Sequence, residues 1–482
     1  MTKQEAAIKY ITENYLDYRR LRHDIVADKL QIRMADSLED ASLQNAPMGL
    51  QFRGSEYWRE MTKHDINSIV CHCAQEYDAN ITSREVMTAL QSDLIPDVHP
   101  LREYVNALPR YTPDQPDWID FVAQQVRVRE TSADRPKGLS ERTACCQTTM
   151  LLDRPYGAER PTNLTGEAGL TVSEAHGLTS SSSQSERSEA DRLWRVCFKK
   201  WFVAMVASWM KDEVVNHQVL VLIGKQGIFK TTWLEHLIPP HLRAYACKLA
   251  NSNDLNKDER LRIAEFGLIS LDEIDSMNNR ELNQLKSVIT ATDVNERAAY
   301  AYTKERRVRL ASFCASGNRR DFLTDITGNR RWLPFEVESI QNPFYTLLPY
   351  ERMYAQAWAL AQDPLFSYWF DLDEIEVLEE HNQHFRDESN EEQLLPILFD
   401  VPAEGKGEFM TTAQISERLV TYGNIKKPMA LGRLGVLMGS MGYRSVTRGN
   451  RQARLRGWIV YQRDTEEIAA NKKLLAKECV TV

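Results

Sequence analysis

A run of five apolar residues that ends at a glycine constrains the fold of this chain more than any other segment. Val219–Ile223 is apolar throughout and is followed by Gly224, a short loop and a helical pattern that begins at Lys230. A strand that is apolar at every position is typical of a parallel sheet that helices cover on both faces. Two further apolar segments, Phe266–Leu271 and Ala311–Ala315, alternate with helical patterns. This part of the chain is therefore predicted to be an α/β fold with a mostly parallel sheet.

Length, composition and charge limit the class of protein. The chain has 482 residues and a formal net charge of -8, which at about 150 residues per domain suggests roughly three domains. The acidic balance excludes a uniformly basic coat for nucleic acid but permits local basic surfaces. The apolar run Trp201–Met210 is half the length of a membrane span, the N-terminus has no apolar signal segment, and the cysteines follow no framework spacing. We expect a cytoplasmic protein with no membrane partner.

Composition divides the chain into four regions. Residues 1–128 are predicted to form a mostly helical N-terminal module. Residues 129–189 are rich in Pro, Gly, Ser and Thr and are predicted to be a disordered linker, although a partner-binding segment is the alternative. Residues 190–390 hold the predicted α/β core. Residues 405–463 are predicted to form a winged-helix-like DNA-binding domain, because two helical patterns precede an alternating hairpin pattern.

The last region differs in charge from the rest of the chain. Between Val420 and Arg463 there are nine Lys or Arg residues and no acid. The predicted DNA contacts in the hairpin are Arg448, Arg451 and Arg454. A solvated basic surface with no ligand is the alternative.

The loop after the first apolar strand has the composition of a Walker A loop. In such a loop, backbone N–H groups at a helix N-terminus surround phosphates, Lys230 reaches the β and γ oxygens, and the Thr231 hydroxyl binds Mg²⁺. The cofactors predicted from this loop are ATP and Mg²⁺. Phe229 stands where glycine usually precedes the lysine, so the loop should be strained or slightly different. A turn with no ligand is the alternative. The predicted binding residues are Gly224, Gln226, Gly227, Lys230, Thr231 and Thr232.

Two adjacent acids end the second apolar strand. Asp272 lies forty-two residues after Lys230, and Glu273 follows it directly. This pattern predicts a Walker B site in which Asp272 holds the Mg²⁺ shell and Glu273 polarises the attacking water. Asp275 is expected to be an exposed residue at the start of a helix. Acids that merely cap the next helix are the alternative.

Polar residues beyond the third strand complete the predicted catalytic set. Asn318 follows that strand and is a candidate for holding the attacking water or the γ-phosphate, with a plain Gly-Asn turn as the alternative. Arg330 and Arg331 are candidates for an arginine finger that reaches the γ-phosphate of a neighbouring subunit. A surface salt-bridge cluster is the alternative for these arginines.

Together these residues resemble the virulence-associated E family, which belongs to the superfamily 3-like helicases of phages and mobile elements. The resemblance rests on Leu222–Gly227, Lys230–Thr232, the Leu271–Glu273 strand end, Asn295–Tyr300 and Thr327–Pro334. It implies an AAA+-like P-loop ATPase core, assembly into a hexameric ring and translocation on single-stranded DNA. Because the chain has no room for a primase-like domain, a separate primase is a further partner that the resemblance suggests.

The resemblance also implies a DNA-contacting hairpin between the second strand and Asn318. Residue alternation there suits a hairpin with Lys304 near its tip, where one cation per subunit would face the phosphate backbone. Tyr302 would stack on a base, and Arg306 is a further candidate contact. An ordinary solvated charged turn is the alternative.

The leading functional hypothesis is an ATP-dependent DNA helicase or translocase that acts on single-stranded and forked DNA in replication of a mobile element. A DNA-binding initiator or regulatory scaffold that uses ATP as a slow switch is the alternative, and Phe229 favours it. An ATPase that acts in defence or in interference with mobile elements would have the same fold, and the sequence does not distinguish it from a replication protein.

Overall fold

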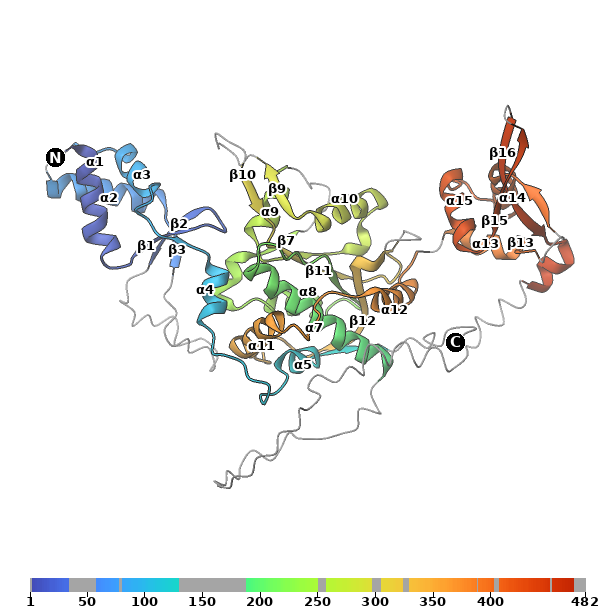
Figure 1. Ribbon diagram of the computed structural model, residues 1–482, viewed down its shortest axis with the longest axis horizontal. Coiled ribbons are helices and arrows are strands. Elements are labelled where there is room, and N and C mark those ends of the chain that lie inside the picture. Colours follow the sequence, from blue (N-terminus) through green and yellow to red (C-terminus); the bar gives the residue numbers. More distant parts are fainter. Residues whose placement is uncertain are drawn as a thin grey trace, which may run out of the picture. The chain divides into compact units, whose positions relative to one another are not determined.

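The computed structural model describes residues 2–33, 58–77, 80–129, 188–249, 257–296, 305–323, 329–387, 389–402, 407–450 and 453–471. Within them the protein is a mixed α/β structure with several sheets and many helices (Figure 1). The predicted linker at residues 129–189 lies, apart from its ends, outside the described residues. Contacts divide the chain into two units. The first holds described residues up to 318 together with 331–375, and the second holds those of 319–330 and 376–471.

The N-terminal part of the first unit combines helices with a small sheet. Its helical segments are α1 (Lys3–Ile11), the π-helical turn η1 (Thr12–Leu16), α2 (Lys63–Tyr77) and α3 (Ser83–Leu90). Its sheet has the order β3–β2–β1–β4, with β1 (Leu21–Asp24), β2 (Lys29–Arg33), β3 (Trp58–Glu60) and β4 (Asp97–Val98). The sequence did not predict this sheet, because such short strands carry too few alternating positions.

The first unit is centred on a six-stranded sheet with the order β5–β12–β6–β11–β8–β7. The strands are β5 (Val126–Val128), β6 (Val219–Ile223), β7 (Ala246–Leu249), β8 (Leu268–Leu271), β11 (Ser312–Gly317) and β12 (Trp332–Ile340). All neighbours are parallel except β5, which is antiparallel to β12. The three strands predicted from their apolar runs are adjacent, as β6–β11–β8, and every residue in them is buried. The predicted parallel sheet is therefore confirmed.

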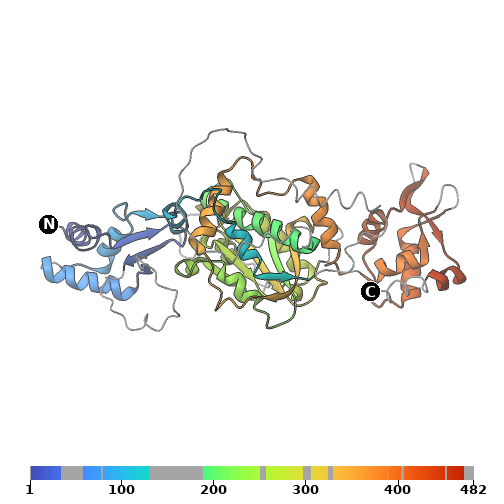
Figure 2. The ribbon, with the colours of Figure 1, turned by 90° about the horizontal axis from the view of Figure 1, so that it is seen from below.

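Helices surround this sheet (Figures 1 and 2). No helix among the described residues is long and apolar enough to cross a membrane. The α-helices of the first unit around this sheet are α4 (Pro100–Ala107), α5 (Trp118–Ala123), α7 (Glu189–Met210), α8 (Lys230–His236), α9 (Lys257–Glu265), α10 (Asn279–Thr290) and α11 (Tyr350–Gln362). Helix α12 (Leu372–Gln383) begins in the first unit and belongs mostly to the second. The short 3-10 turns are η4 (Pro240–Tyr245), η6 (Ile274–Ser276) and η7 (Asn329–Arg331).

Helix α7 is fixed to the sheet by three tryptophans. Trp194, Trp201 and Trp209 lie seven and eight residues apart, so they share one face of the helix, and each is fully buried. Each indole N–H donates a hydrogen bond to a backbone carbonyl, so burial leaves no indole donor unpaired. The acceptors are, in turn, the carbonyl oxygens of Ala123, Phe313 and Gly267, at 3.0, 3.1 and 3.1 Å. Because Phe313 is on β11 and Gly267 precedes β8, the helix sets the relative positions of these strands.

The predicted hairpin between the second strand and Asn318 is present at its base. Strands β9 (Asp293–Glu296) and β10 (Glu305–Val308) pair antiparallel, with Glu305 opposite Glu296 and Val308 opposite Asp293. Residues 297–304, which include the predicted tip, lie outside the described residues. Arg309 follows β10 and is fully buried, and its guanidinium donates to the carbonyls of Ala311 and Asn216 at 3.0 and 2.8 Å. Burial lowers the pKa of Arg309 to about 9.

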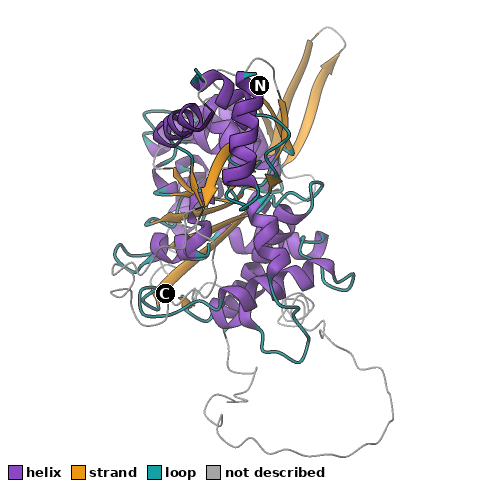
Figure 3. Cartoon of the chain, turned by 90° about the vertical axis from the view of Figure 1, so that its left-hand side faces the viewer, coloured by secondary structure: helices purple, strands orange, loops and turns teal. Residues whose placement is uncertain are grey.

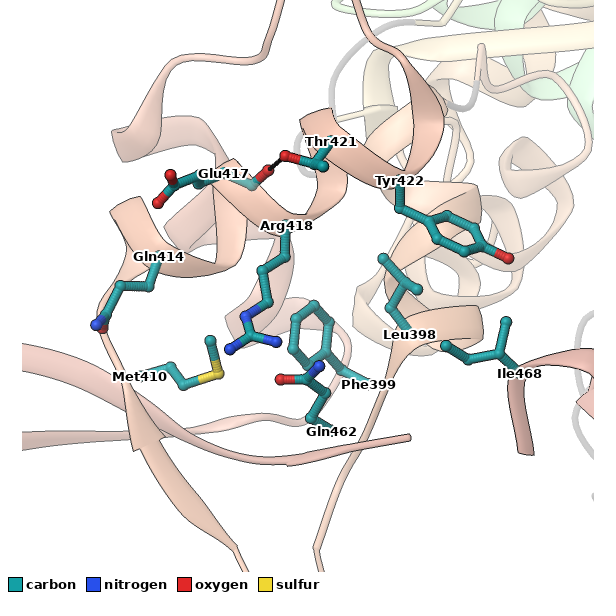
Figure 4. Close-up of a pocket in the computed structure, with 10 residues that line it drawn as sticks. All are labelled: Leu398, Phe399, Met410, Gln414, Glu417, Arg418, Thr421, Tyr422, Gln462 and Ile468. Carbon is teal, nitrogen blue, oxygen red and sulfur yellow. Dashed lines mark hydrogen bonds between the residues drawn. The ribbon is translucent and has the colours of Figure 1, made fainter. Parts of the chain in front are cut away.

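The second unit has its own core and the element order predicted for it. Figure 3 distinguishes the helices (purple) from the strands (orange) of the described chain. Helices α14 (Thr412–Gly423) and α15 (Leu431–Ser440) precede the hairpin of β15 (Arg444–Asn450) and β16 (Ala453–Gln462). Helix α13 (Asn390–Leu398) and strands β13 (Phe399–Asp400) and β14 (Glu408–Met410) complete it. Figure 4 shows a groove in this unit, in which the Arg418 side chain points toward Phe399 and Gln462.

We predict that His99 makes the first unit sensitive to acid. His99 is the N-cap of α4, and its Nδ1 accepts the Arg102 N–H at 3.3 Å. Burial, together with the charge of Arg102, lowers its pKa from 6.5 to about 4. Between these pH values the unfolded chain binds a proton that the folded chain does not, so stability falls as the pH falls from about 6.5 toward 4.

Thermal melting at pH 7.5 and pH 5 should therefore show a smaller loss of Tm for His99→Asn than for the parent chain. Asparagine keeps a capping acceptor but does not titrate. Equal pH dependence of the two proteins would contradict this role of His99.

Candidate functional site

The carboxyl ends of three parallel strands meet at one edge of the central sheet. Strand β11 lies between β6 and β8, with Gly317 opposite Ile223 and Ala315 opposite Leu271. The loop before α8, the acids after β8 and the polar residues after β11 therefore leave the sheet side by side. Open α/β sheets bind ligands at this edge.

Lys230 lies at the centre of this convergence. Its side chain is largely buried, and its Nζ donates to the carbonyl oxygens of Gly224 and Lys225, both at 2.7 Å. The same Nζ lies 3.3 Å from Asn318 Oδ1, so the structure brings two predicted site residues together. Burial lowers the pKa of Lys230, and the charges of Asp275 and Asp272 oppose that shift.

A chain of hydroxyl contacts joins α8 to the end of β8. Thr231 Oγ1 lies 2.9 Å from Ser316 Oγ, and Ser316 Oγ donates to Asp272 Oδ1 at 2.7 Å. Thr231 also lies 3.3 Å from the same carboxylate oxygen. The predicted metal-binding pair, Thr231 and Asp272, is thus in direct contact, and Ser316 on the intervening strand fixes both groups.

A cation lies on the far side of the Asp272 carboxylate. Lys248, on β7, places its Nζ 2.8 Å from Asp272 Oδ2 and 3.9 Å from a Glu235 oxygen. Burial raises the pKa of Asp272, but hydrogen bonds from Lys248, Ser316 and Thr231 outweigh burial, and the pKa is lower than usual. Asp272 is therefore held as a carboxylate at neutral pH.

The loop between β6 and α8 has the backbone conformation that its glycines permit. A Cβ on Gly224 would lie 2.6 Å from the carbonyl oxygen of Val337, so β12 approaches too closely for any side chain there. Gly227 has a φ of 86°. Phe229 has a φ of 67°, a left-handed conformation that costs a residue with a side chain about 1 kcal/mol. The strain expected from a phenylalanine at this position is confirmed.

The other predicted residues of the loop lie beside these. Gln226 is exposed within the turn that connects Gly224 to Gly227, and Thr232 is half-buried in the first turn of α8. Gln226, Gly227 and Thr232 therefore lie within the same loop and helix start as Lys230, on the backbone that leads from β6.

Glu273 and Asp275 follow Asp272 in a strained turn. Glu273 is exposed and has a φ of 53°, so it is a second non-glycine residue in the left-handed region at this site. Backbone strain of this kind is concentrated at functional sites. Asp275 is half-buried in η6 and its Oδ1 accepts the Asn318 N–H at 3.2 Å. The expectation that Asp275 is exposed was therefore wrong, because the β11 terminus packs against it.

The donor set suits a hard divalent cation that also binds phosphate. Mg²⁺ is usually held by one or two carboxylates together with substrate phosphates rather than by a cage of protein ligands. Thr231 and Asp272 supply one hydroxyl and one carboxylate at the end of the loop. Among the described residues no group of three or more His, Cys, Asp or Glu is arranged to hold a metal ion.

The remaining predicted residues lie on other elements or outside the described residues. Arg330 is exposed and Arg331 half-buried, in η7 before β12. Arg306 is exposed on β10 and paired with Asp293 at 2.5 Å. Arg448 is exposed with its guanidinium 4.7 Å from the centre of the Phe409 ring, and Arg454 is exposed on β16. Tyr302, Lys304 and Arg451 lie outside the described residues.

Sequence analysis missed two residues that contact the predicted set, Lys248 and Ser316, and it gave Asp275 no part in the site. Ser316 ends an apolar strand and Lys248 lies in a segment with no recognised motif, so neither carries a signal in one sequence. Only the pairing of β7, β8 and β11 brings them to Asp272.

We predict that Ser316→Ala destabilises the site. Removing this buried hydroxyl leaves two polar partners without their shared hydrogen bond, which should lower the free energy of unfolding by about 1–2 kcal/mol. Urea denaturation measures this difference. Ser287→Ala, at an exposed position of α10, is the matched control and should change the stability little. A loss no larger than that of the control would contradict the role of Ser316.

Comparison with known proteins bears on the same segment. The family model described as the virulence-associated protein E-like domain matches residues 174–392. No curated protein matches the chain. Residues 174–392 include all three converging strands and every residue of the site, so this chain carries a virulence-associated protein E-like domain, as its motifs predicted.

Two solved structures illustrate how distant the structural relatives are. "The apo structure of NrS-1 C terminal region (305-718)" is 11% identical, covers 95% of this chain and 100% of its own, and has a TM-score of 0.41. "The A form apo structure of NrS-1 C terminal region-CTR" is also 11% identical, with coverages of 92% and 98% and a TM-score of 0.38. These scores are too low to support any conclusion about this chain. The family model of the virulence-associated protein E-like domain matches the segment that holds the predicted motifs, residues 174–392.

Proposed function

We propose that this chain binds Mg²⁺-ATP between β6, β11 and β8 and hydrolyses it to move along DNA during replication of a mobile element. The observation that carries the proposal is the contact of Thr231 with Asp272 beside the buried Lys230. An ammonium, a hydroxyl and a carboxylate at neighbouring strand ends are the groups that a metal-bound triphosphate requires. The family membership supports the link to mobile elements.

The proposed division of labour follows the geometry of the site. The backbone N–H groups of Gly224, Gln226, Gly227 and Thr232 and the ammonium of Lys230 bind phosphate oxygens. Thr231 and Asp272 hold Mg²⁺, which when bound neutralises charge on the phosphates. In this proposal the first unit is a P-loop core, and the contact of Asn318, at the end of the intervening strand, with Lys230 supports it.

Glu273 is the proposed general base. Its carboxylate is exposed next to Asp272, on a turn whose strain fixes its backbone. In this role Glu273 accepts a proton from the attacking water, while Asp272 remains bound to the metal. Asn318, whose Oδ1 contacts the Lys230 ammonium, senses the presence of the terminal phosphate in this proposal.

Assembly and DNA contact extend the proposal beyond one chain. In a hexameric ring, Arg330 or Arg331 of one subunit stabilises the charge that develops on the γ-phosphate bound by the next. The β9–β10 hairpin presents Lys304, Tyr302 and Arg306 to single-stranded DNA. A separate primase is a further proposed partner.

The second unit is proposed to be a winged-helix-like domain that binds duplex or forked DNA. Two helices precede a basic hairpin, and Arg448 and Arg454 are exposed on that hairpin. Arg451 lies in the same hairpin sequence. This unit, with the strained Phe229, also favours the second candidate function, an initiator or scaffold in which ATP acts as a slow switch.

We predict that Lys230→Ala abolishes ATP hydrolysis both in the absence and in the presence of DNA. Loss of the ammonium removes charge stabilisation at the phosphates, and a decrease of at least about 100-fold is expected. Phosphate release measured with and without forked DNA tests this. Lys225→Ala is the matched control, because it removes an exposed ammonium from the same loop and keeps the backbone carbonyl that accepts from Lys230. Equal effects of both changes would contradict the proposal.

We predict that Glu273→Gln binds ATP with nearly unchanged affinity but hydrolyses it about 100- to 10,000-fold more slowly. The amide cannot accept the proton of water, whereas the phosphate and metal contacts remain. Equilibrium binding and single-turnover hydrolysis separate the two effects. Hydrolysis at the parent rate would exclude Glu273 as the base.

The two candidate functions differ in turnover and in DNA selectivity. The translocase proposal requires ATP-dependent unwinding of forked DNA by the full chain. Negligible turnover, combined with retention of one duplex sequence that Arg448→Ala abolishes, would favour the initiator.

A further inference from the structure

Three aromatic rings lie together along one side of α8. The Phe344 ring, from the loop between β12 and α11, lies edge-on to the Phe229 ring, with centroids 6.5 Å apart and planes at 81°. It is also edge-on to the His236 ring, at 5.5 Å and 84°. Phe229 is the N-cap of α8 and His236 is its last residue, so Phe344 spans the length of this short helix.

Phe344 is held in place but largely exposed. The residue is 63% exposed, although phenylalanine is among the residues most often buried. The backbone around it is fixed, because Asn342 Oδ1 accepts the Phe344 N–H at 3.0 Å and the Asn342 carbonyl accepts the Tyr345 N–H at 3.1 Å. An exposed ring on an ordered turn offers one free aromatic face at a small entropic cost of binding.

This cluster is continuous with the proposed nucleotide site. Phe229 immediately precedes Lys230, and Thr232 lies one helical turn before His236, whose Nδ1 is 2.7 Å from the Thr232 carbonyl oxygen. Strand β12 runs beside the phosphate loop, as the close approach of Val337 to Gly224 shows, and leads to the loop that carries Phe344. A nucleotide with its phosphates at Lys230 can therefore extend along the side of α8 to these rings.

The backbone conformation of Phe229 is a second unusual feature of this cluster. Glycine would adopt the left-handed backbone of this position without strain, yet the chain has a phenylalanine there. At this position the Phe229 ring packs edge-on against the Phe344 ring. The packing of the two rings compensates in part for the backbone strain, since an edge-to-face aromatic pair is stabilising.

We infer that Phe344, supported by Phe229 and His236, is the stacking platform for the base of the bound nucleotide. This inference rests on the proposed function and deepens it by assigning the nucleobase subsite. The rings supply an aromatic face, so recognition depends on stacking area rather than on the edge of the base. ATP and GTP should therefore bind similarly, and CTP and UTP more weakly.

The test compares two ligands that differ in the nucleoside. Isothermal titration with Mg²⁺ gives the Kd of ATP and of inorganic tripolyphosphate for the full chain. Phe344→Ala should weaken ATP binding about tenfold and leave tripolyphosphate binding unchanged, whereas Phe344→Trp should retain ATP affinity. Leu347→Ala removes another exposed apolar side chain from the same loop and should change neither Kd. Because both positions are exposed, the variants should fold like the parent protein, with only a small fall in Tm for Phe344→Ala, which loses the edge-to-face pair with Phe229.

Each other outcome overturns a defined claim. If Phe344→Ala weakens both ligands equally, or neither, the base does not stack on Phe344 and the inference is wrong. If the parent chain binds ATP and tripolyphosphate equally well, the base makes no contact, which overturns the inference but leaves the proposed function intact. If the parent chain binds neither ligand, or Lys230→Ala binds both like the parent, the proposed function itself fails.

Discussion

A short chain of hydrogen bonds across three strand ends organises the candidate site. Ser316 on β11 joins Thr231 at the start of α8 to Asp272 at the end of β8. This contact requires β11 to lie between β6 and β8, because an adjacent pairing of those two strands would leave no hydroxyl between them. The same intervening strand brings Asn318 to Lys230. Strand order therefore converts separate sequence motifs into one cluster of phosphate- and metal-binding groups.

The rigid frame behind this cluster allows strain within it. Three buried tryptophans of α7 donate hydrogen bonds to backbone carbonyls at the end of α5, on β11 and just before β8, so the helix fixes these segments relative to one another. Against this frame, Phe229 and Glu273 hold left-handed backbone conformations on opposite sides of the site. Among the described residues, positive φ values without glycine occur at only three other positions. Phe229 and Glu273 both belong to the candidate site, and strained backbone conformations are concentrated at functional sites.

Much of the core and its motifs could be predicted from the sequence, because buried parallel strands are apolar at every position. Val219–Ile223 has this pattern, β8 (Leu268–Leu271) and β11 (Ser312–Gly317) have it apart from their serines, and glycine at 224 and 227 marks the loop. Lys248 and Ser316 could not be predicted, because their importance arises only from strand pairing. The N-terminal sheet was missed for a similar reason, since its short strands lack periodicity. The exposure expected of Asp275 was wrong because a single sequence does not show that Asn318 packs against it.

The proposed function depends most directly on where a triphosphate binds. A structure of the full chain with Mg²⁺ and a non-hydrolysable ATP analogue would test it. We expect the terminal phosphate within hydrogen-bonding distance of Lys230 Nζ, and the metal bound by Thr231 and reached by Asp272. A nucleotide bound elsewhere, or phosphates that make no contact with Lys230, would contradict the account.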